Sequence, residues 1–297
     1  MGNSSETYYV PAQSHWPIIG AVGLFALLGG GGLVLHSMQM QGQASLFSQI
    51  VLFSGILIMA GMLFGWFATV IVEASKGLYS PQLDISFRFG MSWFIFSEVM
   101  FFFAFFGVLF YTRNFSVPWL GGEGDKGIAH MLWPDFTAVW PMLNSPDIEQ
   151  FPPIKEIINP WHVPMINTIL LLSSSVTLTL AHKALKRGNR KLIKIWLTIT
   201  LVLGVSFIAL QVSEYAEAYQ HLDLTLQSGI YGATFFLLTG FHGAHVTIGS
   251  IILFVLLMRV FKGHFTPEKH FAFEAGAWYW HFVDVVWVLL FTLVYLV

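Results

Sequence analysis

The sequence predicts an all-α membrane protein that crosses the bilayer seven times. Of its 297 residues, 56% are hydrophobic and only 10% are charged, and the mean hydropathy is +0.68. A soluble fold of this size could not bury so much apolar surface, whereas lipid accepts apolar side chains when the backbone satisfies its own hydrogen bonds. The apolar segments are long and continuous instead of alternating with a period of two, which indicates helices and not the strands of a barrel.

Seven segments are long enough to cross a bilayer, because a hydrocarbon core of about 30 Å needs about 20 helical residues. In order along the chain, the predicted helices lie near residues 16–35, 46–72, 86–111, 162–182, 192–210, 228–258 and 271–297.

Turn residues mark the breaks between these helices. The segment Gly77 to Pro81 separates the second helix from the third, and Gly188-Asn189 separates the fourth from the fifth. Residues 116–160 join the third helix to the fourth and are rich in Gly, Pro and acidic residues. This stretch predicts an extramembrane loop with its own packing, so we expect one domain over residues 1–297.

The basic residues predict the orientation of the chain. Eleven of the 14 Lys and Arg residues lie in or beside three connections that share one side of the membrane, at residues 76–88, 183–194 and 259–269. The connection after the fifth helix has acidic residues and no base. The positive-inside rule therefore places the N-terminus in the cytoplasm or matrix and the C-terminus on the opposite side.

Composition also excludes several classes of function. The net charge is −2 and no dense basic patch is present, which argues against a nucleic acid partner. The chain has no cysteine, so it has no disulfide, no thiolate metal site and no iron–sulfur cluster held by its own cysteines.

Glu98 is the clearest polar residue at membrane depth. An ionised side chain near the bilayer centre costs about 2.5 to 3.5 kcal/mol. Glu98 lies about twelve residues into the third predicted helix, with no base within one helical turn. We expect a role in proton handling or in a lipid site; the alternative is a protonated or hydrogen-bonded packing residue.

Two further pairs of polar residues are spaced three apart and so share a helical face. His242 and His245 could supply two metal ligands, but a complete site needs more ligands, and the small residues around them favour close helix packing. We therefore expect hydrogen-bonded packing histidines. His281 and Asp284 could form a hydrogen bond, either in a structural network facing another subunit or in a proton relay.

Several carboxylates fall at predicted helix ends. Glu73 ends the second helix, and Glu214 and Glu217 end the fifth. Side chains at such positions reach headgroups and water, so solvated helix ends are expected.

Six motifs together resemble the subunit III family of cytochrome c oxidases. They are Trp16-Pro17, Ser97-Glu-Val-Met-Phe-Phe102, Pro164-Met-Ile-Asn-Thr168, Ser213-Glu-Tyr215, Gly240-Phe-His-Gly-Ala-His-Val246 and Phe273 to Trp287. The last two are long and specific. The resemblance implies seven helices in two groups, the first two separated from the other five by a V-shaped cleft that holds phospholipids.

The resemblance also implies a function and partners. The chain would be an accessory subunit docked on subunit I, which carries the haems and the copper of the oxygen site, while subunit II, the other partner, supplies a second copper centre. It would have no cofactor, metal ligand or catalytic residue of its own and no activity alone. It would support proton uptake, stability during turnover and lipid binding beside subunit I in aerobic respiration.

Individual residues match the family pattern. Glu98 matches the family's membrane-buried carboxylate, and Glu73 matches a carboxylate near the lipid cleft. His242 and His245 match its paired histidines, and His281 with Asp284 matches its final-helix signature. Val72 stands where some relatives carry a polar residue, so a lipid phosphate would need another cation such as Arg88 or Arg259. The family often has two adjacent histidines where this chain has His182-Lys183.

The 116–160 loop looks longer than in mitochondrial members. This favours a bacterial type in the bacterial inner membrane, with a periplasmic C-terminus.

Three alternatives compete with this interpretation. The nearest is subunit III of a quinol oxidase, although such chains commonly lack the first two helices. A transporter or proton channel would use Glu98, the paired histidines and Asp284 as a relay. An independent haem or metal enzyme would use the paired histidines and His281 as ligands.

Overall fold

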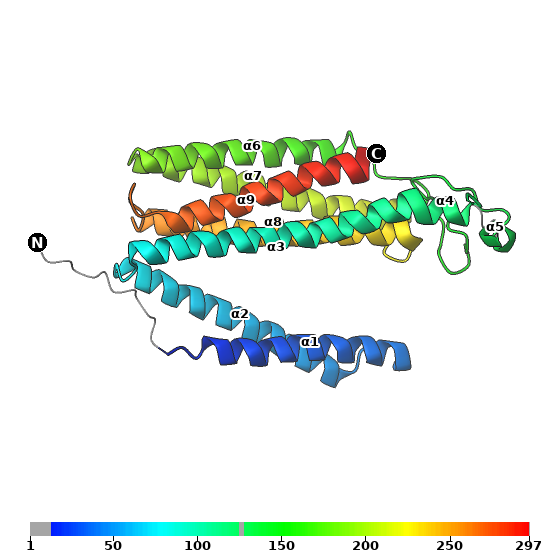
Figure 1. Cartoon of the computed structure of the whole chain (residues 1–297), viewed down its shortest axis with the longest axis horizontal. Coiled ribbons are helices and arrows are strands. Elements are labelled where there is room, and N and C mark those ends of the chain that lie inside the picture. The colour runs from blue at the N-terminus through cyan, green and yellow to red at the C-terminus, as the bar shows by residue number, and fades with distance from the viewer. Residues whose placement is uncertain (1–12, 125–127, 297) are drawn as a thin grey trace, which may run out of the picture. The chain divides into compact units, whose positions relative to one another are not determined.

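The computed structural model describes residues 13–124 and 128–296. Within these ranges every regular element is a helix, and seven helices are long and apolar enough to cross a membrane (Figure 1). This confirms the predicted fold class.

The long helices are mostly longer than predicted. Their bounds are α1 Trp16–Gln41, α2 Leu46–Ser75, α3 Pro81–Tyr111, α6 Val163–Lys186, α7 Arg190–His221, α8 Gly229–Phe261 and α9 Phe271–Leu290. Helix α7, for example, ends at His221 and not near residue 210, because no Gly or Pro interrupts the intervening segment. Two helices continue as π-helical turns, α3 through Thr112–Ser116 and α9 through Phe291–Leu296.

The chain divides into two compact units, Met1–Phe87 and Arg88–Val297. The boundary falls inside α3. The lipid-holding cleft between the first two helices and the other five therefore stays a prediction.

In the first unit, α1 and α2 form a hairpin with a very close crossing. A Cβ atom on Gly30 would lie 2.4 Å from the backbone nitrogen of Leu52, and one on Gly55 would lie 2.3 Å from that of Leu27. Only glycine fits at these two positions, so the helix backbones touch as they do in other tightly packed membrane helices.

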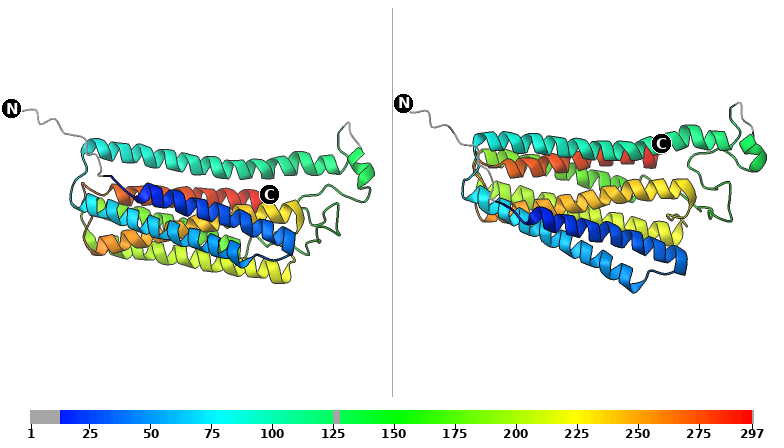
Figure 2. Two further views of the ribbon diagram at one scale, coloured as in Figure 1. Left: turned by 90° about the horizontal axis from the view of Figure 1, so that it is seen from below. Right: turned by 60° about the horizontal axis from the view of Figure 1, so that its bottom comes forward.

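In the second unit, α9 is the most enclosed helix. It packs against α6 and α8, while α7 packs against α6 and α8 (Figures 1 and 2). Trp280 and Trp287 of α9 are completely buried, and each indole nitrogen donates a hydrogen bond to α6, at 2.8 Å to Ser174 Oγ and 2.9 Å to Thr168 Oγ1. These bonds satisfy the polar part of a large apolar side chain and fix the register between the two helices.

Two glycines make room for the Trp280 ring. A Cβ atom on Gly204 of α7 would lie 2.6 Å from Trp280 Cη2, and one on Gly249 of α8 would lie 2.9 Å from Cε3. Gly243, also on α8, faces open space. The run of small residues in α8 therefore reflects close packing at Gly249 in particular.

The loop over residues 116–160 contains two short helices, α4 Val117–Leu120 and α5 Ile128–Leu132. It is attached to the connection between α7 and α8, because Lys155 forms an ion pair of 2.7 Å with Asp223 and its amide donates to the Leu222 carbonyl oxygen at 3.0 Å.

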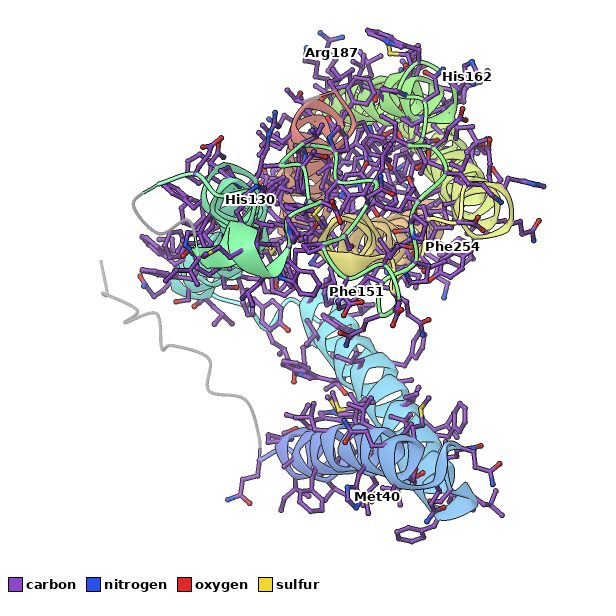
Figure 3. The ribbon with its side chains drawn as sticks, turned by 90° about the vertical axis from the view of Figure 1, so that its right-hand side faces the viewer. Met40, His130, Phe151, His162, Arg187 and Phe254 are labelled. Carbon is purple, nitrogen blue, oxygen red and sulfur yellow. The ribbon has the colours of Figure 1, made fainter. Side chains whose placement is uncertain are left out.

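Much of the helix surface is apolar, as the side chains in Figure 3 show. On α3, the side chains of Trp93 and Phe103 are 68% and 67% exposed. Soluble monomers rarely expose such large contiguous apolar patches, so this surface is suited to lipid or to other subunits.

Candidate functional site

Glu98 of α3 and His245 of α8 form a pair at membrane depth. His245 Nε2 lies 2.9 Å from Glu98 Oε2, and the two side chains are 13% and 23% exposed. The sequence selected both residues but did not predict that they meet, because 147 positions separate them.

The contact made by the second nitrogen of His245 limits which hydrogen bonds the Glu98–His245 pair can form. Nδ1 lies 2.6 Å from the carbonyl oxygen of Phe241. A carbonyl oxygen can only accept, so Nδ1 carries a hydrogen and donates it. Nε2 then accepts a hydrogen bond from protonated Glu98, or carries a second hydrogen and donates it to the Glu98 carboxylate. In both forms one proton lies between the two side chains and the pair has no net charge.

Aromatic rings surround this pair. Phe102 packs edge-on against the His245 ring with 5.0 Å between centroids, and Phe101 lies at 6.0 Å. The Tyr279 ring stacks on the His245 ring with 6.4 Å between centroids, and its hydroxyl donates to the His245 carbonyl oxygen at 3.4 Å. Apolar surroundings make a net charge here costly, which favours the neutral pair.

His242 lies in different surroundings from His245, although the two share a helix. Its side chain is completely buried between the rings of Phe207 and Trp287, at 5.7 and 5.2 Å. Neither ring nitrogen has a hydrogen-bond partner among the described residues. Among the described residues, His242 therefore packs between aromatic rings and lacks the hydrogen bonds that the sequence predicted for it.

His281 makes its hydrogen-bond contacts with α6. Its Nδ1 lies 3.1 Å from Ser175 Oγ and its Nε2 lies 3.5 Å from Thr179 Oγ1. Among the described residues it makes no hydrogen bond with Asp284, whose Oδ1 is buried without a partner. The described residues therefore lack the predicted hydrogen bond between His281 and Asp284, and the imidazole instead contacts the hydroxyl groups of Ser175 and Thr179 on α6.

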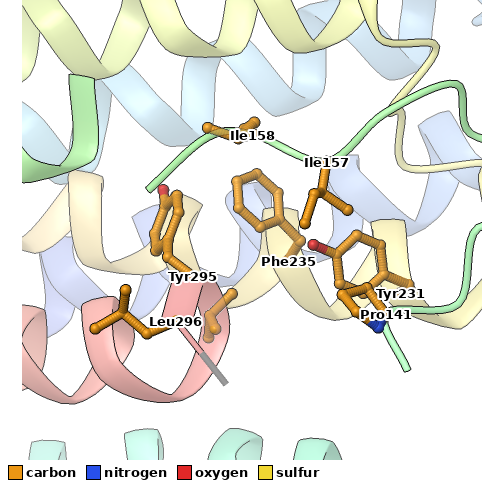
Figure 4. A pocket seen from close by; sticks show the side chains of 8 residues that line it. Pro141, Ile157, Ile158, Tyr231, Phe235, Tyr295 and Leu296 are labelled. Atoms are coloured by element: carbon orange, nitrogen blue, oxygen red, sulfur yellow. The ribbon is translucent and has the colours of Figure 1, made fainter. Parts of the chain in front are cut away.

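Glu214 contradicts the expectation of a solvated helix end. It is 1% exposed, and its Oε1 accepts hydrogen bonds from Tyr295 at 2.6 Å and from Gln211 at 3.3 Å. Helix α7 continues beyond this residue, so Glu214 lies within the bundle and not at its end. Tyr295 and Phe235 also line a cavity of about 70 Å³ (Figure 4).

The lipid-site candidates all have partners within the protein. Glu73 accepts a hydrogen bond of 3.1 Å from the Tyr79 hydroxyl. The Arg88 guanidinium forms an ion pair with Glu274, and the Arg259 guanidinium lies over the Phe265 ring at 4.5 Å.

The sequence missed a cluster of ionisable groups around Glu274. His182 of α6 and His270, which precedes α9, both approach this carboxylate. The four-residue spacing of His270 and Glu274 was the only signal available, because His182 comes from a distant segment.

Comparisons with known proteins agree along nearly the whole chain. A family model described as cytochrome c oxidase subunit III matches residues 6–297. Proteins named cytochrome c oxidase subunit 3 from Formosania lacustris and Squalus acanthias are 38% identical to this chain, and one from Hippopotamus amphibius is 40% identical. Each alignment covers 99% of this chain and 98% of the relative.

These relatives come from vertebrates. They do not support the bacterial type that the length of the 116–160 loop predicted.

Proposed function

Because the chain belongs to the cytochrome c oxidase subunit III family, we propose that it is an accessory subunit of that oxidase, without redox centres of its own. It supports proton uptake by the oxygen-reducing subunit, sustains that subunit through repeated turnover and holds lipid beside it. The chain alone has no oxidase activity.

The Glu98–His245 pair carries this proposal. It holds one proton between two groups in aromatic surroundings, where gaining or losing a proton would create a net charge. A charge or proton nearby would change the protonation of such a pair, which otherwise remains neutral.

The proposed partners are subunits I and II, which supply the haems and copper that this chain does not. Cytochrome c is the proposed electron donor, and a quinol is the alternative. Oxygen consumption by the purified complex with reduced cytochrome c, compared with a soluble quinol, distinguishes the two donors.

Phospholipids are the proposed ligands of this chain. Glu73, Arg88 and Arg259 remain the candidates for binding the headgroups, because a guanidinium is suited to hydrogen bonds with a phosphate. Lipid extraction and mass spectrometry of the complex with Arg259→Gln would show loss of a tightly held phospholipid.

We propose that the chain lies in a membrane that holds a respiratory oxidase. The vertebrate relatives favour the mitochondrial inner membrane over the bacterial one. The three basic connections are proposed to face the matrix or cytoplasm.

Glu98→Gln tests the role of the pair. We expect the complex to assemble and to begin turnover at nearly the normal rate, but to take up protons more slowly and to inactivate at least several-fold sooner during sustained oxygen consumption. Glu217→Gln is the matched control, because Glu217 is an exposed carboxylate on α7. Equal lifetimes and proton uptake in the two variants and the unaltered complex would refute the proton-linked role and leave packing as the function of Glu98.

A further inference from the structure

The cluster around Glu274 lies within the second unit, where the end of α6 meets the start of α9. His182 is near the end of α6, His270 immediately precedes α9, and Glu274 is in the first turn of α9. Arg88, near the start of α3, forms an ion pair with Glu274. Neither the proposed oxidase role nor the Glu98 pair uses His182, His270 or Glu274.

Three donor atoms converge in this cluster. Glu274 Oε1 lies 3.2 Å from His270 Nε2 and 3.7 Å from His182 Nε2, and all three atoms lie within 4.8 Å of one another. The side chains of His270, Glu274 and His182 are 10%, 14% and 22% exposed. Both Nε2 atoms are buried and make no hydrogen bond to a described residue.

The backbone fixes the orientation of His270. Its Nδ1 lies 3.2 Å from the Thr266 carbonyl oxygen and donates to it, which leaves the Nε2 of a neutral ring as an acceptor. That lone pair faces a carboxylate oxygen, so two acceptors point at each other unless a cation lies between them. A histidine that donates one nitrogen to a carbonyl and directs the other into a buried cluster is typical of metal ligands.

We propose that this cluster is a zinc site, with His182 Nε2, His270 Nε2 and Glu274 Oε1 as ligands and a fourth position for water. Two imidazoles and one carboxylate are a common ligand set for zinc. Zinc–ligand bonds of about 2.0–2.1 Å in a tetrahedron bring ligand atoms roughly 3.4 Å apart. The distances of 3.2 and 3.7 Å are within a few tenths of an ångström of that value.

A proton on one histidine would satisfy fewer of these donor atoms than a metal ion would. It would bridge a single nitrogen to the carboxylate, whereas a metal ion bonds all three donor atoms. Arg88 favours binding through one carboxylate oxygen, because its guanidinium holds Oε2 at 2.5 Å and leaves Oε1 facing the histidines. The bound ion would link the end of α6 to the start of α9.

Zinc content tests the proposal directly. The intact complex, isolated through this chain, is treated with EDTA, equilibrated with zinc and desalted, and zinc is measured by mass spectrometry per copy of the chain. We expect His182→Gln and His270→Gln each to lose one zinc per chain, with affinity at least about 100-fold weaker. His264→Gln, an exposed histidine in the same connection as His270, is the matched control and should lose none.

A second measurement uses the unaltered complex and so does not depend on how the variants fold. Zinc should protect His182 and His270, but not His264, from modification by diethyl pyrocarbonate after EDTA treatment. Equal zinc content in all variants, or equal modification with and without zinc, would overturn the proposal and leave a protonated ion-pair cluster. Neither readout depends on oxidase activity, so this result is separate from the test of Glu98.

Discussion

Glu214 shows how a residue's surroundings can differ from those that its sequence neighbours suggest. Its buried carboxyl group has hydrogen-bond donors in Tyr295 and Gln211, and no ion pair with a described base. A buried acceptor that loses its donor costs about 1–3 kcal/mol. The Tyr295 hydroxyl should therefore contribute strongly to the stability of the bundle.

Tyr295→Phe tests this contribution. We expect it to lower the midpoint of thermal unfolding, measured by tryptophan fluorescence of the detergent-solubilised complex. Tyr219→Phe is the control, since the Tyr219 side chain is 46% exposed and its hydroxyl only accepts a weak hydrogen bond of 3.5 Å from Leu226. Equal midpoints for the two variants would contradict a stabilising role for the buried hydrogen bond.

The sequence identified polar residues at membrane depth better than it identified their partners. Glu98 and His245 were selected because a charge in lipid is costly, and this argument applies to each residue alone. Their pairing depends on how α3 packs against α8, which the sequence pattern does not show. It also does not show that His242 lies beside the Trp287 ring. The carboxylate at Glu214 was misjudged because the end of α7 was placed too early.

At the scale of the helix, the close packing of α7 and α8 against α9 depends on one large side chain, Trp280. Trp280 occupies space that Gly204 and Gly249 leave open. The sequence predicted seven helices from apolar length alone, which a bilayer makes a strong signal. It could not predict the π-helical turns or the closest crossings, because these depend on contacts between helices.

Gly249→Val tests this packing. The added side chain would meet the Trp280 ring, and overpacking of this kind costs about 1–3 kcal/mol. We expect less assembled complex and a lower unfolding midpoint. Gly243→Val makes the same change on the same helix where a Cβ has open space, so it controls for helix propensity. If both variants assemble equally well, Gly249 is not a packing constraint.

For the whole molecule, the lipid environment accounts for the fold class, and the orientation stays a prediction. The exposed apolar side chains need hydrocarbon or other subunits, and the basic connections are predicted to lie on one side of the membrane. Composition and charge are enough to predict these features, because they are properties of the chain as a whole.

Labelling of single cysteines tests the orientation, and the absence of native cysteine makes the experiment clean. Lys191→Cys, at the start of α7, should react with a membrane-impermeant maleimide only from the matrix or cytoplasmic side. Gln227→Cys, between α7 and α8, should react only from the other side. Both positions are exposed, so reversed labelling would mean that the predicted orientation is wrong.

This chain is proposed to be an oxidase subunit without redox centres. The most direct test isolates the tagged chain from its native membrane in mild detergent and records the absorbance spectrum before and after the chain is separated from its partners. We predict haem a absorbance with two co-purifying subunits, and a colourless chain once it is stripped from them. Haem absorbance that stays with the isolated chain, or a chain that purifies alone and colourless, would contradict the account.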